Sequence, residues 1–103
     1  MYYKEKNMEK RNTKFESVFG DSIQVKTLDF FLEAGKVSFP VDALVEEKEI
    51  GKSQAYETIN KLIRENILVE EKVYKKKKYY KLNLKNLKTK EIQRMFHKII
   101  FLD

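Results

Sequence analysis

Residues 49–83 read EIGKSQAYETINKLIRENILVEEKVYKKKKYYKLN, and this stretch decides the fold because its apolar spacing changes partway along. In its first half the apolar residues recur at the three- and four-residue spacing of a helix with one buried face, namely Ala55, Ile59, Leu62 and Ile63. Ile67-Leu68-Val69 and Lys72-Val73-Tyr74 then begin a strand, and Tyr80-Lys81-Leu82-Asn83-Leu84 alternates as a half-buried strand does. The stretch therefore predicts a helix followed by a hairpin joined over Lys75–Lys78.

Two local details of this stretch are also predicted. Ser53 can cap the helix at its start, because its hydroxyl can accept a backbone hydrogen bond. The join over Lys75–Lys78 contains neither Gly nor Asn-Gly. Because tight two-residue hairpin turns favour those residues, we expect a longer connection.

The residues before this stretch predict three helical segments. Thr13-Lys14-Phe15-Glu16 has capping-box spacing, so a short helix starts there and ends at Gly20. A second helix, capped by Asp21 or Ser22, runs to about residue 34 and ends at Gly35. Its core face consists of Val25, Leu28, Phe31 and Leu32. Pro40 precedes a third helix over about 41–48 with Val41, Leu44 and Val45 inward.

The C-terminal residues predict one more helix. Thr89 can cap it, and its apolar positions share one broad face: Ile92, Met95, Phe96, Ile99 and Ile100. We therefore expect three parts: a flexible N-terminal arm over 1–12, one domain over 13–84, and an added helix over 85–103.

The positive charge of the chain is concentrated in one place. Lys and Arg number 22 and Asp and Glu number 16, a net charge of +6. Residues 72–81 read KVYKKKKYYK and hold six lysines and no acid, so they account for the whole excess. Such a run becomes a nucleic-acid contact when the fold directs it at a phosphate backbone. A solvated charged edge that prevents aggregation is the other interpretation.

Composition excludes several classes of protein. The chain has no Cys, so neither disulfides nor thiolate metal sites are possible. Its N-terminus is charged where a signal peptide needs an apolar stretch, and no apolar run approaches a membrane span. A cytoplasmic protein that does not contact a membrane is expected.

The order helix, short helix, tight turn, helix, hairpin resembles that of winged helix-turn-helix transcriptional regulators, especially small archaeal ones. The resemblance covers residues 15–84 and rests on Ser53, Tyr56, Asn60-Lys61-Leu62-Ile63, Ile67-Leu68-Val69 and Tyr80-Lys81-Leu82-Asn83. It implies an α+β, mostly helical fold: a three-helix core, a two-stranded β wing and, here, an added C-terminal helix. It also implies sequence-specific binding to double-stranded DNA.

Two positions depart from the family pattern. The turn after the second core helix usually has Gly, and this chain has Glu49. The end of the third core helix often has Gly, and this chain has Asn66, the next-best residue for a left-handed conformation. A non-Gly residue in that conformation costs about 1 kcal/mol, which a good core offsets.

The expected DNA contacts lie on the third core helix and on the wing. Gln54, Asn60, Lys61 and Arg64 can hydrogen-bond base edges or phosphates in a major groove, and Ser53 and Tyr56 can hold phosphates. Lysines on the wing would neutralise the backbone. The predicted DNA-binding residues are Lys52, Ser53, Gln54, Tyr56, Asn60, Lys61, Arg64, Lys75, Lys76, Lys77 and Lys78.

No catalytic constellation is evident, so we expect no enzyme, no cofactor and no metal. The single His97 has no acid at catalytic spacing, and the three scattered glycines supply no phosphate-binding loop. The chain leaves no room for an effector domain, so no small-molecule ligand is expected. The alternative function is a winged helix that binds protein or RNA within a larger assembly.

The C-terminal apolar face also predicts self-association. It could fold back on its own core, or it could pair with a second copy. Because a core already filled by its helices has limited room, we favour a homodimer. The predicted interface consists of Phe15, Phe19, Ile92, Met95, Phe96, Ile99 and Ile100.

Overall fold

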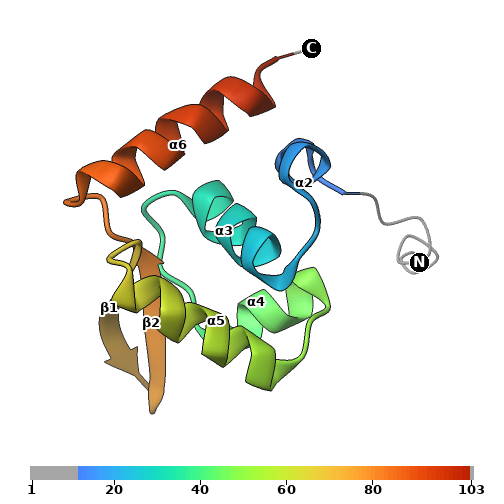
Figure 1. Cartoon of the computed structure of the whole chain (residues 1–103). Helices are drawn as coiled ribbons and strands as arrows, with labels where there is room; N and C mark the ends of the chain where they lie inside the picture. The colour runs from blue at the N-terminus through green and yellow to red at the C-terminus, as the bar shows by residue number, and fades with distance from the viewer. Residues whose placement is uncertain (1–11, 103) are drawn as a thin grey trace.

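The structure is a computed structural model that describes residues 12–102, so the predicted arm over 1–12 lies outside the described residues except at position 12. Within that range the chain forms five helices and one two-stranded sheet (Figure 1). In order they are α2 (Lys14–Phe19), α3 (Ile23–Ala34), α4 (Val41–Lys48), α5 (Lys52–Arg64), β1 (Leu68–Tyr74), β2 (Lys77–Leu82) and α6 (Leu87–Ile100). The prediction of a mostly helical α+β fold is confirmed.

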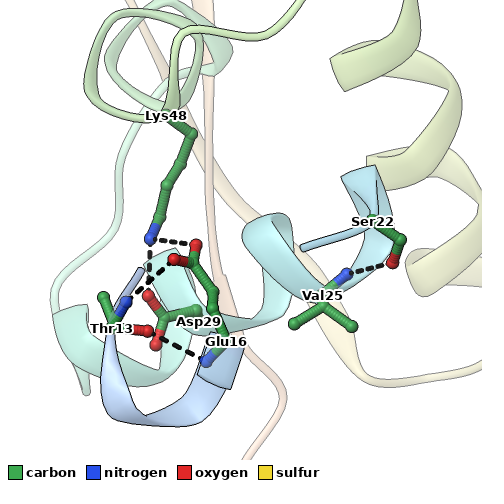
Figure 2. Close-up of polar contacts among 6 residues, drawn as sticks. All are labelled: Thr13, Glu16, Ser22, Val25, Asp29 and Lys48. Atoms are coloured by element: carbon green, nitrogen blue, oxygen red, sulfur yellow. Dashed lines mark hydrogen bonds and ion pairs between the residues drawn. The ribbon is translucent and has the colours of Figure 1, made fainter. Parts of the chain in front are cut away.

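Most helix boundaries follow the predicted local signals. The Thr13 hydroxyl accepts from the Glu16 backbone N–H at 3.1 Å, and the Glu16 carboxylate accepts from the Thr13 N–H at 2.9 Å. Figure 2 shows this capping box and the Ser22 hydroxyl, which accepts from the Val25 N–H at 3.1 Å at the start of α3. Both caps satisfy backbone donors that a helix start leaves unpaired.

The connection between α4 and α5 is short and left-handed at one residue. Pro40 stands immediately before α4, and Glu49 ends it with φ 56° and ψ 49°. Asn66, beyond the end of α5, also has a positive φ of 62°. The sequence-based expectation for these two positions is confirmed.

Two predicted caps are wrong. Ser53 is the second residue of α5, because Gly51 is the N-cap, and no side chain caps this helix. Thr89 lies inside α6, because the Asn86 side chain accepts its backbone N–H at 3.2 Å and caps the helix. The buried Thr89 hydroxyl instead donates to the Asn66 carbonyl at 3.2 Å, so it ties α6 to the end of α5.

The hairpin, Leu68–Leu82, has a tighter turn than predicted. Tyr74 pairs with Lys77, so only Lys75 and Lys76 connect the strands, with φ values of 51° and 67°. Two positive φ values in a two-residue turn match the twist of the flanking strands. The expectation of a longer connection over Lys75–Lys78 was wrong, because strand pairing extends to Lys77 and imposes this conformation on two lysines.

The hairpin is anchored to the helical part of the chain at Tyr80. The backbone of Tyr80 exchanges hydrogen bonds of 2.8 and 2.9 Å with that of Phe39, in the segment leading to α4. Tyr80 and Leu82 of β2 and Leu68 of β1 are buried in the core. One face of the hairpin is thus fixed on the domain while its tip projects into solvent.

The core lies among all five helices and the base of the hairpin. Its fully buried large apolar side chains are Phe31, Leu32, Leu44, Ile59, Leu62, Leu68 and Phe96. The predicted core residues Val25, Leu28 and Ile63 are partly buried against it. In Figure 1, α2 and α6 lie on one side of α3, and α4 and α5 lie on the other.

The apolar face of α6 packs on its own chain. Phe96 is 2% exposed and its ring meets that of Phe15, itself 3% exposed, edge to face at 5.6 Å. Ile92, Ile99 and Ile100 also pack against the core. The expectation that the core lacked room for this helix was therefore wrong, because α2 adds a second surface that buries Phe15 and Phe96 together.

A buried ionic cluster joins three helices and was not predicted. The Lys48 ammonium, at the end of α4, lies 2.8 Å from a Glu16 oxygen of α2 and 2.5 Å from an Asp29 oxygen of α3 (Figure 2). The side chains are 9%, 5% and 4% exposed, respectively. Burial alone would raise the pKa of Glu16, but hydrogen bonds from Lys48 and Thr13 outweigh it and lower that pKa. Hydrogen bonds from Lys48 to Asp29 and Glu16 likewise raise the pKa of Lys48 despite its burial, so the Glu16–Lys48 pair favours its charged form.

Candidate nucleic-acid interface

Helix α5 presents a polar face away from the core. Ala55, Ile59 and Leu62 are buried on one side, as their spacing requires. Every residue predicted to contact DNA from this helix is exposed: Lys52, Ser53, Gln54, Tyr56, Asn60, Lys61 and Arg64. Lys61 and Arg64 lie in its last turn, and Arg64 is about 18 Å along the axis from Lys52 at the 1.5 Å rise of an α-helix.

The run of four lysines, Lys75–Lys78, lies at the tip of the hairpin and at the start of β2. Lys75 and Lys76 form the turn, whereas Lys77 and Lys78 belong to β2, and all four are exposed. Because the tip carries no core residue, its position is set by strand pairing and by the Tyr80 anchor.

Two tyrosines that were not predicted to contribute support these lysines. The rings of Tyr74 and Tyr79 meet edge to face at 6.4 Å on one side of the hairpin. The Lys75 ammonium lies 5.5 Å from the centre of the Tyr74 ring, and the Lys72 ammonium lies 5.2 Å from that of Tyr79. Cation–π contacts of this kind orient a cation without neutralising it, so the lysines keep their charge for an anionic partner. The available signal was the position of Tyr74 and Tyr79 directly on either side of the four-lysine run.

A groove runs between α5 and the hairpin. We call it the α5–hairpin groove; it has a volume of about 400 Å³. Residues from both elements line it, and the floor comes from the start of α4: Pro40, Val41, Asp42, Lys52, Tyr56, Asn60, Lys76, Lys77, Lys78 and Tyr80. The tertiary structure therefore unites part of both predicted contact sets on one concave surface.

Not every predicted residue lines this groove. Ser53, Gln54, Lys61 and Arg64 lie on the exposed surface of α5 outside the groove, and Lys75 lies at the hairpin tip. An extended polymer that entered the groove could reach these residues at its rims. The arrangement thus suits a long anionic ligand better than a small one, since the cationic groups spread well beyond the groove.

Asp42 is an acidic residue at the centre of this basic surface. Its carboxylate lies 2.6 Å from the Lys77 ammonium and 3.3 Å from the Lys52 ammonium. The hydrogen bond from Lys77, followed by that from Lys52, lowers the pKa of Asp42, and Asp42 in turn raises the pKa of Lys77. Sequence reasoning missed Asp42, because only the fold brings α4, α5 and β2 to one point.

The residues predicted for a dimer interface differ in how far the chain itself buries them. Phe15 and Phe96 are buried within the chain, and Ile92, Ile99 and Ile100 are partly buried. Phe19 and Met95 remain exposed, at 46% and 39%. Phe15 and Phe96 are therefore not available to a second copy in this structure.

Residues 12–102 hold no cluster of three or more acidic or histidine side chains suited to a metal ion. No helix in the same range is long and apolar enough to cross a membrane.

Comparison with known proteins places no relative beside this chain. No family model matches it, and neither the curated proteins nor the solved structures yield a significant match.

Proposed function

We propose that the chain is a winged helix-turn-helix transcriptional regulator that binds double-stranded DNA in a sequence-specific manner. In this proposal α4 and α5 form the helix-turn-helix, α5 is the recognition helix, and the hairpin is the wing. One observation carries the proposal: three lysines of the hairpin and three polar residues of α5 line the same groove, namely Lys76, Lys77, Lys78, Lys52, Tyr56 and Asn60. A DNA major groove admits an α-helix, and the adjacent phosphates would lie along the wing.

Each contact residue has an expected role. Gln54 and Asn60 carry side-chain amides, which pair with base edges, and we assign them to base reading. Lys61, Arg64, Ser53 and Tyr56 would hold phosphates, which fix the register of the protein on the duplex. Lys52 and the wing lysines would add the salt-dependent part of the affinity.

Salt-dependent binding tests the proposal directly. Replacing Lys75, Lys76, Lys77 and Lys78 together with Ala removes up to four phosphate contacts, which should flatten the slope of log K against log salt by up to about 3.6. Fluorescence anisotropy with a labelled duplex at several salt concentrations measures this slope.

A matched control separates local contact from net charge. Replacing Lys85, Lys88, Lys90 and Lys98 with Ala removes the same charge on or just before α6, away from the α5–hairpin groove. The control should keep most of the slope. If both variants lost it equally, the wing would have no special role in binding.

The RNA-binding and protein-binding alternatives give different results in the same assay. The major groove of A-form RNA is too deep and narrow for side chains to read. The proposal therefore expects weaker binding to an RNA duplex of the same sequence. Equal binding to both duplexes would favour an RNA-binding module, and no binding to either would favour a protein partner.

Base reading has its own test. After a preferred site has been selected from random duplexes, Gln54→Ala or Asn60→Ala should cost about 1–3 kcal/mol on that site and relax its sequence preference. An equal loss on all sequences would reassign the residue to backbone contact.

We further propose that the chain acts as a homodimer, with Phe19 of α2 and Met95 of α6 at the interface. Both are exposed apolar residues on the two elements that pack together through Phe15 and Phe96. A two-fold pairing could place two recognition helices about 34 Å apart, one turn of DNA.

Light scattering at micromolar concentration tests whether the chain is a dimer. Phe19→Glu with Met95→Glu should yield a folded monomer, whereas a monomeric wild type would exclude the dimer.

A further inference from the structure

Asp42 pairs with two lysines of the α5–hairpin groove. It belongs to the first turn of α4. One of its carboxylate oxygens pairs with the ammonium group of Lys52 at the start of α5, and the other pairs with that of Lys77 in β2. These are the two elements assigned above to the recognition helix and the wing. One carboxylate therefore bridges the two halves of the proposed DNA-binding surface.

Carboxylates and phosphate diesters make the same kind of contact with lysine. Each is an oxyanion with one negative charge that accepts charge-assisted hydrogen bonds from an ammonium group. The Lys77 pair, at 2.6 Å, has the short distance typical of such bonds. In the free protein, Asp42 thus satisfies two cations that the α5–hairpin groove would otherwise offer to DNA.

The bridge is open to solvent and so can be exchanged. The Asp42 side chain is 42% exposed, Lys52 is 61% exposed and Lys77 is 56% exposed. Ion pairs of this exposure contribute little to stability and are screened by salt. Because Lys77 and Lys52 lower the pKa of Asp42, the carboxylate is charged at neutral pH and repels a phosphate that approaches the same lysines.

We propose that Asp42 holds the place of a DNA backbone phosphate between α5 and the hairpin and thereby restrains non-specific binding. This inference rests on the proposed DNA-binding function. Phosphate contacts carry no sequence information, whereas contacts with base edges do. A built-in competitor for phosphate lowers the affinity for every duplex by the same factor at the backbone. The ratio of affinities for two sequences stays the same, but a duplex without good base contacts to α5 is bound less at any given protein concentration.

The test compares Asp42→Asn with the wild type on a short duplex of arbitrary sequence. Asn has the same shape and no charge, so Lys52 and Lys77 become available to phosphates. At low salt the variant should bind about three- to tenfold more tightly. Its salt slope should steepen by at most about 1.8, the value reached if Asp42 keeps both Lys52 and Lys77 from phosphate in the wild type. On a selected site the variant should gain by a similar factor, because the backbone contacts are the same for every sequence.

Glu91→Gln is the matched charge control. Glu91 is an exposed residue of α6 that pairs with Arg94 and lies outside the α5–hairpin groove, so its loss changes net charge equally. It should leave the salt slope at the wild-type value. A gain as large as that of Asp42→Asn would assign the effect to overall charge and overturn the proposal.

A double substitution traces the gain to the bridge itself. In a Lys77→Gln background the added effect of Asp42→Asn should shrink, because one of the two released cations is missing. An undiminished gain would mean that Asp42 acts without Lys77, contrary to the proposal.

Two failures can be told apart. If the wild type shows no salt-dependent duplex binding, the proposed function fails and this inference fails with it. If the wild type binds DNA but Asp42→Asn binds equally or more weakly, with an unchanged urea midpoint, this inference alone is overturned. Asp42 would then orient the two lysines toward DNA.

NMR titration of the free protein checks the contact without DNA, since Lys77→Gln should raise the pKa of Asp42 toward its ordinary value of 3.8.

Discussion

Each end of α4 has one charged side chain held between two groups of the opposite charge, and the signs are exchanged between the two ends. At its start, the Asp42 carboxylate lies between two ammonium groups, and at its end the Lys48 ammonium lies between two carboxylates. A negative charge at the start of a helix and a positive charge at its end both interact favourably with the helix dipole. The Asp42 bridge is about half exposed, whereas the Lys48 cluster is almost fully buried. Burial decides their consequences, because water screens the first and is excluded from the second.

The comparison teaches where charge serves stability and where it serves binding. A buried ion pair becomes a liability when one partner is removed, since the remaining charge has no water to solvate it. An exposed pair loses little when broken, so its partners remain free to bind another ion. Substitutions at the two ends of α4 and at the hairpin turn should separate these two roles.

Lys48→Met should give the largest loss of stability. It leaves Glu16 and Asp29 buried without their cation, which costs about 3–5 kcal/mol. Urea unfolding measures the loss, and Lys98→Met on the exposed face of α6 should stay within about 0.5 kcal/mol of the wild type. Adding Glu16→Gln and Asp29→Asn to Lys48→Met should restore part of the stability. A loss below about 1 kcal/mol for Lys48→Met would contradict the contrast.

The Lys48 cluster should also make stability depend on pH. The pKa of Glu16 is lowered below its ordinary value of 4.5, despite burial, by hydrogen bonds from Lys48 and Thr13. Its contribution is therefore fully present above the ordinary pKa and is lost as pH falls through the lower folded pKa. Urea unfolding across this acidic range should show a shallower decline for Glu16→Gln than for the wild type. Parallel declines would show that Glu16 does not carry this dependence.

At the hairpin turn we expect two lysines that favour DNA binding and reduce the stability of the fold. Lys75 and Lys76 both have positive φ, which a side chain with a Cβ atom disfavours. Lys75→Asn with Lys76→Gly should therefore raise the free energy of unfolding by about 1–2 kcal/mol while weakening duplex binding. Lys75→Ala with Lys76→Ala removes the same charge and keeps the strain, so it should weaken binding without that stabilisation. Equal stability of the two variants would argue against strain at the turn.

Asp42→Asn should have the smallest effect on stability. Its urea midpoint should match that of the wild type, because the bridge is exposed and water replaces the lost contacts. The same variant changes duplex affinity by the larger factor given above. A marked fall in the midpoint would place Asp42 with the structural cluster at the other end of α4.

Local signals predicted the helices of this chain well. The capping box at Thr13, the cap at Ser22 and the span of α4 depend on residues within one or two turns, and the structure has each of them. The caps at Ser53 and Thr89 were wrong because a neighbouring residue took the capping position: Gly51 for α5 and Asn86 for α6. Several residues near a helix start can compete for that role, and long-range contacts such as that of Thr89 with Asn66 decide among them.

The candidate site was only half predictable. The exposed face of α5 and the lysines of the hairpin follow from spacing and composition, so sequence reasoning identified them. Asp42 and Lys48 carry no such signal, since each is one charged residue among many on a short helix. Their partners lie between 10 and 35 residues away in sequence.

The helices, the hairpin, the exposed face of α5 and the placement of all excess charge in ten residues follow from short-range periodicity and composition, so they can be predicted from the sequence alone. Three further features become visible only in the folded chain: the two-residue turn, the burial of Phe15 against Phe96, and the ionic contacts at the two ends of α4. These features depend on which surfaces meet across the fold. Whether a charged or aromatic side chain is buried or exposed is set by that meeting and not by its neighbours in sequence.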